Sequence, residues 1–322
     1  YTDNVSVILM KGVKRTVPSR WPEAVIADTT LISEAPSLMN RAGYGEINSM
    51  FTAPADWRLA ALLGFEKKFH WGPIELLHGV GEGIEEWAPG LRTSEVESIE
   101  KLVNALAVRG IVTGVADTTA CLSGIEHLIS HMLDMNQAAM HKPVGQHGAQ
   151  VGVGSVIAAA VWDLVFIKLS GEPIKLTSFP DKAALKSRVM RTFHNLDTTD
   201  ALGGECWKDY EKKIDFWIEN SDSIQSFLND WKSHSSELRG LIKNPEEIVQ
   251  GLLVSGSPIN FYDLEPEINK LDAVWAVSNC HLMRNRFVGI DFLEFLGMWT
   301  ESDSNWVFER ATQAIEKVSA TR

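Results

Sequence analysis

The chain has 322 residues, of which 45% are hydrophobic and 22% are charged, a composition typical of a globular protein. Its 30 basic and 42 acidic residues give a net charge of −12, which argues against a nucleic-acid partner or an anionic membrane surface. The three cysteines, Cys121, Cys206 and Cys280, are odd in number and widely spaced, so we expect neither a disulfide framework nor a cysteine metal knuckle. These features predict a reduced, cytoplasmic protein.

The first 32 residues have a β-like pattern. Short runs of β-branched or apolar residues predict strands over 5–10, 13–17 and 24–27, and turn signals separate them. No basic region or small-residue cleavage site precedes the first run, so we do not expect a signal peptide.

From about Ser33 onward the pattern becomes helical. Hydrophobic periodicity predicts helices over 37–41, 46–65, 94–109, 118–135, 147–169, 182–193, 206–220, 223–238, 245–254, 264–280, 289–298 and 304–320. Two segments are expected to interrupt this array, one at Asp200 with Gly203-Gly204 and one at 255–258. The sequence therefore predicts a β segment joined to a large helical domain.

Two segments resemble functional motifs but are better explained as structural. The apolar run 151–169 carries Asp163 and several glycines, which fits a buried core helix better than a membrane span. The glycine cluster 79–83 has no strand leading into it, and Glu85 and Glu86 follow where a pyrophosphate would lie. We therefore expect a flexible surface loop there and no tight binding of NAD(P) by this chain alone.

Three histidines form the most informative pattern. In a helix, His127 and His131 lie one turn apart on the same face, and His147 begins the next apolar helix. Two imidazoles from different helices, with one carboxylate, would make a three-ligand metal site that keeps an open position. The alternative is that the His127 and His131 pair consists of polar core residues with satisfied hydrogen bonds.

Several motifs in this order resemble the sn-glycerol-1-phosphate dehydrogenase group of the iron-containing alcohol dehydrogenase and dehydroquinate synthase-like superfamily. The block AGYGE at 42–46, with FTA and ADWRL at 51–59, is similar to the AGxGD…YTAxADWRL block of that group. SGIEHLISH at 123–131 and HGAQVGVG at 147–154 are similar to its two histidine motifs. Segment 12–28 is similar to the strand region that ends the nucleotide-binding half of that group, and segment 206–210 is a further, weak match.

The resemblance implies a dehydroquinate synthase-like fold that combines an α/β part with an all-α part. On this basis residues 33–322 are expected to form the C-terminal helical domain, which binds metal and substrate. Residues 1–32 would be a residual β segment, the tail of an N-terminal nucleotide-binding domain. That domain, with its glycine-rich phosphate loop, would precede Tyr1 and is absent from this sequence, so the chain is either a fragment or has lost it.

The resemblance also implies a metal site. Carried over motif by motif, the ligands of one divalent ion, Zn²⁺ or another metal, are Glu46, His127 and His147. His131 then becomes a catalytic residue that contacts the substrate, or else a buried hydrogen-bonding histidine. Glu46 departs from the Asp of the group and extends about 1.5 Å further, so the metal could shift, bind more weakly or be lost. The residues that bind the nicotinamide cofactor cannot be assigned.

The function implied is that of a metal-dependent, NAD- or NADP-linked dehydrogenase that interconverts glycerol-1-phosphate and dihydroxyacetone phosphate. The expected partner is a small phosphorylated polyol or ketone, with no nucleic acid and no membrane, and the protein is expected to be a homo-oligomer. Two alternatives stay open. One is a sugar-phosphate cyclase or lyase that uses the same metal site, and the other is a non-catalytic relative without the cofactor domain.

Overall fold

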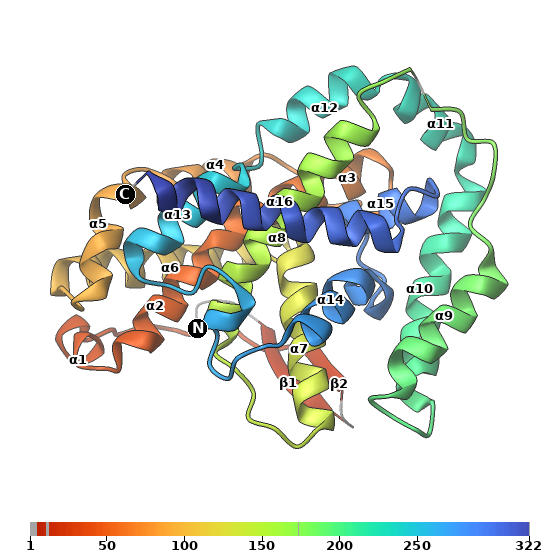
Figure 1. Cartoon of the computed structure of the whole chain (residues 1–322). Helices are drawn as coiled ribbons and strands as arrows, with labels where there is room; N and C mark the ends of the chain where they lie inside the picture. Colours follow the sequence, from red (N-terminus) through yellow and green to blue (C-terminus); the bar gives the residue numbers. More distant parts are fainter. Residues whose placement is uncertain (1–4, 11–12, 173, 322) are drawn as a thin grey trace.

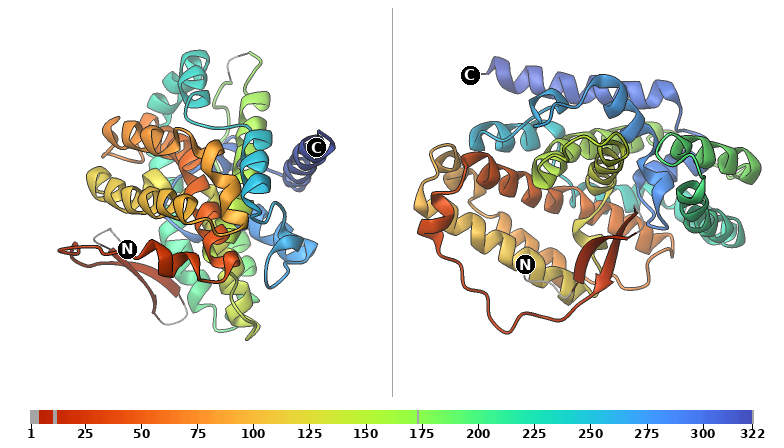
Figure 2. Two further views of the ribbon diagram at one scale, coloured as in Figure 1. Left: turned by 90° about the vertical axis from the view of Figure 1, so that its left-hand side faces the viewer. Right: turned by 90° about the horizontal axis from the view of Figure 1, so that it is seen from below.

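A computed structural model describes residues 5–10, 13–172 and 174–321, and in these residues the fold is predominantly helical. The two strands, β1 (Val5–Met10) and β2 (Val13–Pro18), pair antiparallel and confirm the first two predicted strands. Val5 lies opposite Pro18 and Met10 lies opposite Val13. The hairpin lies at the outside of the helical body (Figure 2).

The third predicted strand is wrong. Residues 24–27 have no regular structure and lead into the first helix at Thr29. Val25 and Ile26 are 51% and 95% exposed, and the described sheet consists of β1 and β2 alone. An isolated β-branched run forms a strand only where a neighbour satisfies its backbone groups, and this segment has no such neighbour among the described strands.

The helical body contains α-helices and a few short 3-10 helices between them (Figure 1). In chain order they are α1 (Thr29–Ser33), α2 (Ser37–Ile47), η1 (Asn48–Phe51), α3 (Ala53–Leu62), α4 (Gly72–Gly81), α5 (Ile84–Trp87), η2 (Ala88–Arg92), α6 (Val96–Ala116), η3 (Ala120–Leu122), α7 (Ile125–Ala139), α8 (His147–Lys168), α9 (Lys182–His194), α10 (Ala201–Glu219), α11 (Ser221–Asn229), α12 (Trp231–Arg239), α13 (Pro245–Ser255), η4 (Phe261–Asp263), α14 (Lys270–Asn279), η5 (Cys280–Met283), α15 (Gly289–Phe295) and α16 (Glu301–Ala320).

Helix α8 is the central element of the core. It runs through the middle of the body, packed against α2, α7, α13 and α16 (Figure 1). By length and composition α8 could cross a membrane, but 89% of its apolar window is buried inside the protein. This burial confirms the prediction that the run is a core helix, since an apolar helix on every side needs protein around it.

Several glycine positions correct the sequence-based boundaries. Gly79 and Gly81 lie in α4 rather than in a loop, and Gly83, at φ +67°, makes the turn into α5. Gly203-Gly204 lies inside α10 and does not interrupt it. Glycine is a weak helix breaker whose cost of about 1 kcal/mol is readily outweighed by packing, so only the residue with positive φ marks a true helix end.

Three predicted helices are divided in the structure. The span 46–65 is broken into the end of α2, η1 and α3, because Pro54 has no N–H to donate and can stand only in the first turn of a helix. In the span 118–135 the 3-10 helix η3 precedes α7, which begins only at Ile125. The span 223–238 forms the two helices α11 and α12. These breaks place Glu46 in the last turn of α2, next to the start of α8.

Candidate metal centre

The structure brings the three predicted ligands together from three helices. Glu46 lies near the end of α2, His127 in the first turn of α7, and His147 is the first residue of α8. One ligand-type atom from each lies within 4.8 Å of the others. Residues 81 and 20 positions apart in the sequence thus converge on one point.

The ring of His127 is fixed by a carboxylate on its outer side. Its Nδ1 lies 2.9 Å from Glu126 Oε1, and since a carboxylate only accepts, Nδ1 donates. Glu126 is fully buried and is held in turn by Thr52 Oγ1 at 2.9 Å and the backbone N–H of Gly124 at 2.6 Å. The other nitrogen, Nε2, faces Glu46 Oε1 at 3.4 Å. This carboxylate–histidine pairing is the usual outer support of a metal-binding imidazole.

His147 is oriented through a different chain of hydrogen bonds. Ser130 Oγ donates to Gln150 Oε1 at 2.7 Å, which uses the single hydroxyl proton. The 2.9 Å contact between Ser130 Oγ and His147 Nδ1 is therefore made with Nδ1 as the donor. The lone pair of His147 is then on Nε2, which lies 3.8 Å from Glu46 Oε2. Both imidazoles thus turn Nε2 toward the same carboxylate.

Glu46 is held by an arginine that the sequence did not single out. Arg109 of α6 is buried, and its Nη1 donates to Glu46 Oε1 at 2.8 Å while Nη2 donates to Ser49 Oγ at 2.8 Å. The second oxygen, Oε2, is buried and has no hydrogen-bond partner among the residues that the structure describes. A buried carboxylate oxygen without a donor is costly, and a cation between the two Nε2 atoms would satisfy it.

The charges at the centre shift two pKa values. Burial alone would raise the pKa of Glu46, but Arg109, His127 and His147 outweigh it and hold that pKa well below its usual range. Burial alone would lower the pKa of His127, but the carboxylates of Glu46 and Glu126 raise it. Glu46 is therefore ionised, as a ligand must be, and a metal at His127 Nε2 must displace a proton.

The donor set fits a divalent transition metal. Two imidazole nitrogens and one carboxylate oxygen are the ligands of catalytic zinc sites, which leave a fourth position for water or substrate. The site is open on one side, since 38% of the His147 side chain is exposed against 9% for His127. The residues present could hold such an ion and leave it accessible to a small molecule.

His131, the predicted catalytic residue, lies beside these ligands. Its ring stacks on that of His147 with the centroids 5.5 Å apart and the planes at 17°, and it lies 6.3 Å from the ring of His127. It is buried, and with Asp134 and His147 it forms a second group whose ligand atoms lie within 4.8 Å of one another. The position agrees with a role at the substrate but does not test it.

Sequence reasoning missed Arg109, Ser130 and Asp134. Ser130 and Asp134 lie in or next to the histidine motif, one turn from His127 and His131, so helical spacing could have found them. Arg109 gave no comparable signal, because a single arginine on an amphipathic helix is usually solvated. Its role depends on the packing of α6 against α2.

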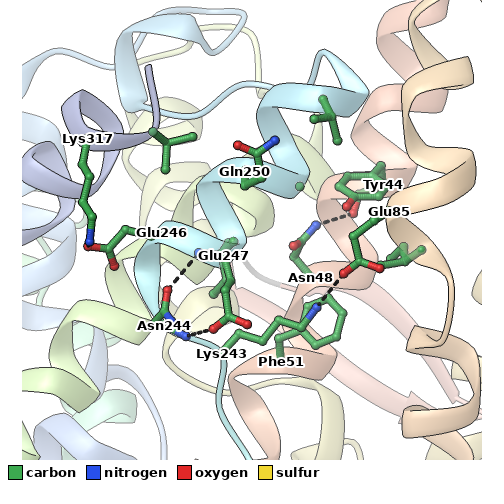
Figure 3. Close-up of a pocket in the computed structure, with 15 residues that line it drawn as sticks. Tyr44, Asn48, Phe51, Glu85, Lys243, Asn244, Glu246, Glu247, Gln250 and Lys317 are labelled. Atoms are coloured by element: carbon green, nitrogen blue, oxygen red, sulfur yellow. Dashed lines mark hydrogen bonds and ion pairs between the residues drawn. The ribbon is translucent and has the colours of Figure 1, made fainter. Parts of the chain in front are cut away.

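A separate cavity of about 560 Å³ lies on the other face of α2, between α5, α13 and the end of α16 (Figure 3). Tyr44 lines it, whereas Glu46, two residues further, points to the metal centre. Lys243 and Lys317 at this cavity are each 3.4 Å from a glutamate, Glu85 and Glu246 respectively. Paired lysines offer little net charge to an anionic ligand, so the cavity adds nothing to the candidate site.

The chain is similar to curated proteins that are named glycerol-1-phosphate dehydrogenase [NAD(P)+]. It is 34% identical over 148 residues to the protein of Methanothrix thermoacetophila, which is 46% of this chain and 40% of that protein. It is 36% identical over 172 residues to the protein of Thermococcus sibiricus, which is 53% of this chain and 47% of that protein. It is 37% identical over 155 residues to the protein of Aeropyrum pernix, which is 47% of this chain and 42% of that protein. The chain thus spans less than half the length of these relatives.

Similar bacterial proteins of the same name are 31% identical in Bacillus velezensis and 30% identical in Geobacillus thermodenitrificans. No family model matches the chain. The resemblance to the glycerol-1-phosphate dehydrogenase group, inferred above from the motifs around Glu46, His127 and His147, is confirmed over about half of the chain.

Proposed function

We propose that this chain carries the metal-binding side of an NAD(P)-linked dehydrogenase that interconverts glycerol-1-phosphate and dihydroxyacetone phosphate. The observation that carries the proposal is the convergence of Glu46, His127 and His147, each imidazole with Nε2 turned inward by its own outer hydrogen bond. The names of the similar proteins support both the substrate and the cofactor.

Within this proposal Glu46, His127 and His147 hold one divalent ion, with Zn²⁺ as the expected metal. When bound there, such an ion would supply Lewis-acid chemistry that makes an alcohol oxygen more acidic, and a nicotinamide would supply the hydride acceptor. The chain's own groups then complete the site. Glu126 and Ser130 keep the two rings in place, and His131 lies where it could hold a proton at the substrate oxygen.

The proposal includes the finer expectations of the motif resemblance. The helical body would correspond to the metal-binding domain of a dehydroquinate synthase-like fold, with β1 and β2 as part of the sheet of the nucleotide-binding domain. The protein would act in the cytoplasm as a homo-oligomer. NAD or NADP would bind mainly to that nucleotide-binding domain and reach the metal from the open side, at His147.

The test combines metal analysis with a substrate titration. Metal-free protein is loaded with Co²⁺, and the visible absorption of the metal is followed as dihydroxyacetone phosphate is added. We expect one Co²⁺ per chain and a spectral change that glycerol-3-phosphate does not reproduce. The exposed His194 on α9, ion-paired with Asp200, supplies a matched control, since His194→Ala should leave both signals unchanged. If the protein retains no metal after incubation with excess Co²⁺, the proposal is overturned.

The ion pair between Arg109 and Glu46 favours a second candidate, a relative that works without metal or with different chemistry. The guanidinium already supplies a positive charge at the carboxylate. Under the main proposal, Glu46→Asp keeps or improves metal affinity and the oxidation of glycerol-1-phosphate in the protein that contains this chain. If neither the wild type nor Glu46→Asp oxidises glycerol-1-phosphate, the second candidate is favoured.

A further inference from the structure

A second set of ligand-type side chains adjoins the first. His131 and Asp134 lie three residues apart on α7, so their side chains are neighbours on one face of the helix. Their ligand atoms and one from His147 lie within 4.8 Å of one another, the same limit that the first set meets. Only 7% of His131 and 6% of Asp134 is exposed. The chemistry of this second set, two imidazoles and one carboxylate, equals that of the first.

The two sets share one residue, His147. As long as His147 Nδ1 donates to Ser130 Oγ, this ring can coordinate a cation only through Nε2. Nε2 can bind a single ion, so the two sets cannot both be filled. They describe two alternative positions of one ion around His147.

The positions differ in whether the ion shares a ligand with Arg109. Arg109 binds Glu46 and Ser49, so its positive charge lies at the first set. Asp134 is seven residues beyond His127 on α7, which is about 10 Å along the helix axis. A divalent ion at the first set shares the carboxylate of Glu46 with the guanidinium of Arg109, whereas an ion at the second set is bound by Asp134 instead and leaves Glu46 to Arg109.

We propose that the divalent ion has a second binding position, formed by His131, Asp134 and His147, in which the Arg109–Glu46 ion pair stays intact. This inference rests on the proposed function, because that function makes His147 a metal ligand and both positions use His147. Zn²⁺, Co²⁺ and Ni²⁺ are the ions that suit this donor set. The ion moves between the two positions by exchanging Glu46 and His127 for His131 and Asp134.

The experiment is a Co²⁺ titration of the metal-free protein, followed by calorimetry and visible absorption. Two double variants each remove the two ligands that belong to one set alone: Glu46→Gln with His127→Gln for the first set, and His131→Gln with Asp134→Asn for the second. His147→Gln removes the shared ligand. We expect the wild type and each double variant to bind one Co²⁺, the double variants with about 10- to 100-fold lower affinity and with different spectra. His147→Gln should bind none at micromolar Co²⁺.

The outcomes separate this inference from the proposed function. If Glu46→Gln with His127→Gln abolishes binding while His131→Gln with Asp134→Asn binds as the wild type, the second position is wrong and the proposed site stands. If the results are reversed, the second position is the metal site and the proposed ligand set is wrong. No binding by the wild type overturns both.

A measurement on single substitutions guards against misfolded double variants. Wild-type protein loaded with ¹¹³Cd²⁺ should give two ¹¹³Cd resonances, or one exchange-broadened resonance that sharpens in Asp134→Asn. Circular dichroism confirms that Asp134→Asn is folded. A single sharp resonance that Asp134→Asn leaves unmoved would overturn the second position.

Discussion

Gly45 of α2 and Gly148 of α8 meet backbone to backbone. A Cβ at Gly45 would lie 2.2 Å from the carbonyl oxygen of Gly148, and a Cβ at Gly148 would lie 2.1 Å from the carbonyl oxygen of Ala42. Only glycine permits this approach. Glu46 follows Gly45 and His147 precedes Gly148, so the close crossing of the two helices brings their side chains together. Glu46 Oε2 lies 3.8 Å from His147 Nε2.

Substitution of Gly45 is therefore expected to damage both stability and the metal centre. Gly45→Ala should lower the free energy of unfolding by about 1–3 kcal/mol, because α2 must move away from α8, and should weaken Co²⁺ binding at the same time. Gly204 of α10 is the matched control, since no described atom outside its own stretch of helix lies within 4 Å of an added Cβ there. Gly204→Ala should be neutral or stabilising by about 0.5–1 kcal/mol. Equal effects of the two substitutions in thermal melts would contradict this account.

Glu126, which accepts a hydrogen bond from His127 Nδ1, should control metal affinity without contacting the metal. Glu126→Gln keeps the shape but weakens the hydrogen bond that orients His127, and we expect about a 10- to 100-fold loss of affinity. Calorimetric titration with Zn²⁺ measures it. As a control, Glu316→Gln on the exposed side of α16 should leave the affinity unchanged. Wild-type affinity in Glu126→Gln would show that His127 does not need this support.

A buried histidine away from the metal centre is expected to make the protein sensitive to acid. His281 of η5 is fully buried, and burial lowers its pKa to about 4 although Glu294 lies 3.3 Å away. The unfolded chain has a histidine pKa of about 6.5. Between pH 6.5 and 4 the unfolded state therefore binds more protons, so stability falls as the pH falls.

The size of the effect follows from the same two pKa values. At pH 5 the loss from His281 is expected to be about 2 kcal/mol relative to pH 7. Urea unfolding of the wild type and of His281→Gln at both pH values measures it. The variant should lose less stability than the wild type on acidification, and parallel losses in both proteins would contradict the assignment.

The described residues are not expected to bind a dinucleotide tightly. In 5–10, 13–172 and 174–321 the two strands form a hairpin, and the glycine cluster 79–83 lies at the end of α4 without a strand before it. A pyrophosphate is usually held by a loop between a strand and a helix N-terminus. Titration of the 322-residue chain with NAD and NADP should show no micromolar binding. A micromolar dissociation constant for either would prove this wrong, and Co²⁺ binding by the same sample serves as its control.

The sequence by itself determined the helical class, the central helix and the three side chains that meet as candidate ligands. Hydrophobic periodicity is local, so it predicted α8, α9 and α13 to within one or two residues. The helical spacing of His127 and His131 is local too. That Glu46 joins His127 and His147 came from the motif resemblance, and the structure brings these three side chains together.

Only the tertiary structure decided which atoms face each other. The run 24–27 has strand character but no strand beside it, so its backbone stays irregular. Arg109 reaches Glu46 only because α6 packs on α2, and His147 presents Nε2 only because Ser130 and Gln150 hold Nδ1. Such choices depend on contacts between residues far apart in the chain, which no local pattern encodes.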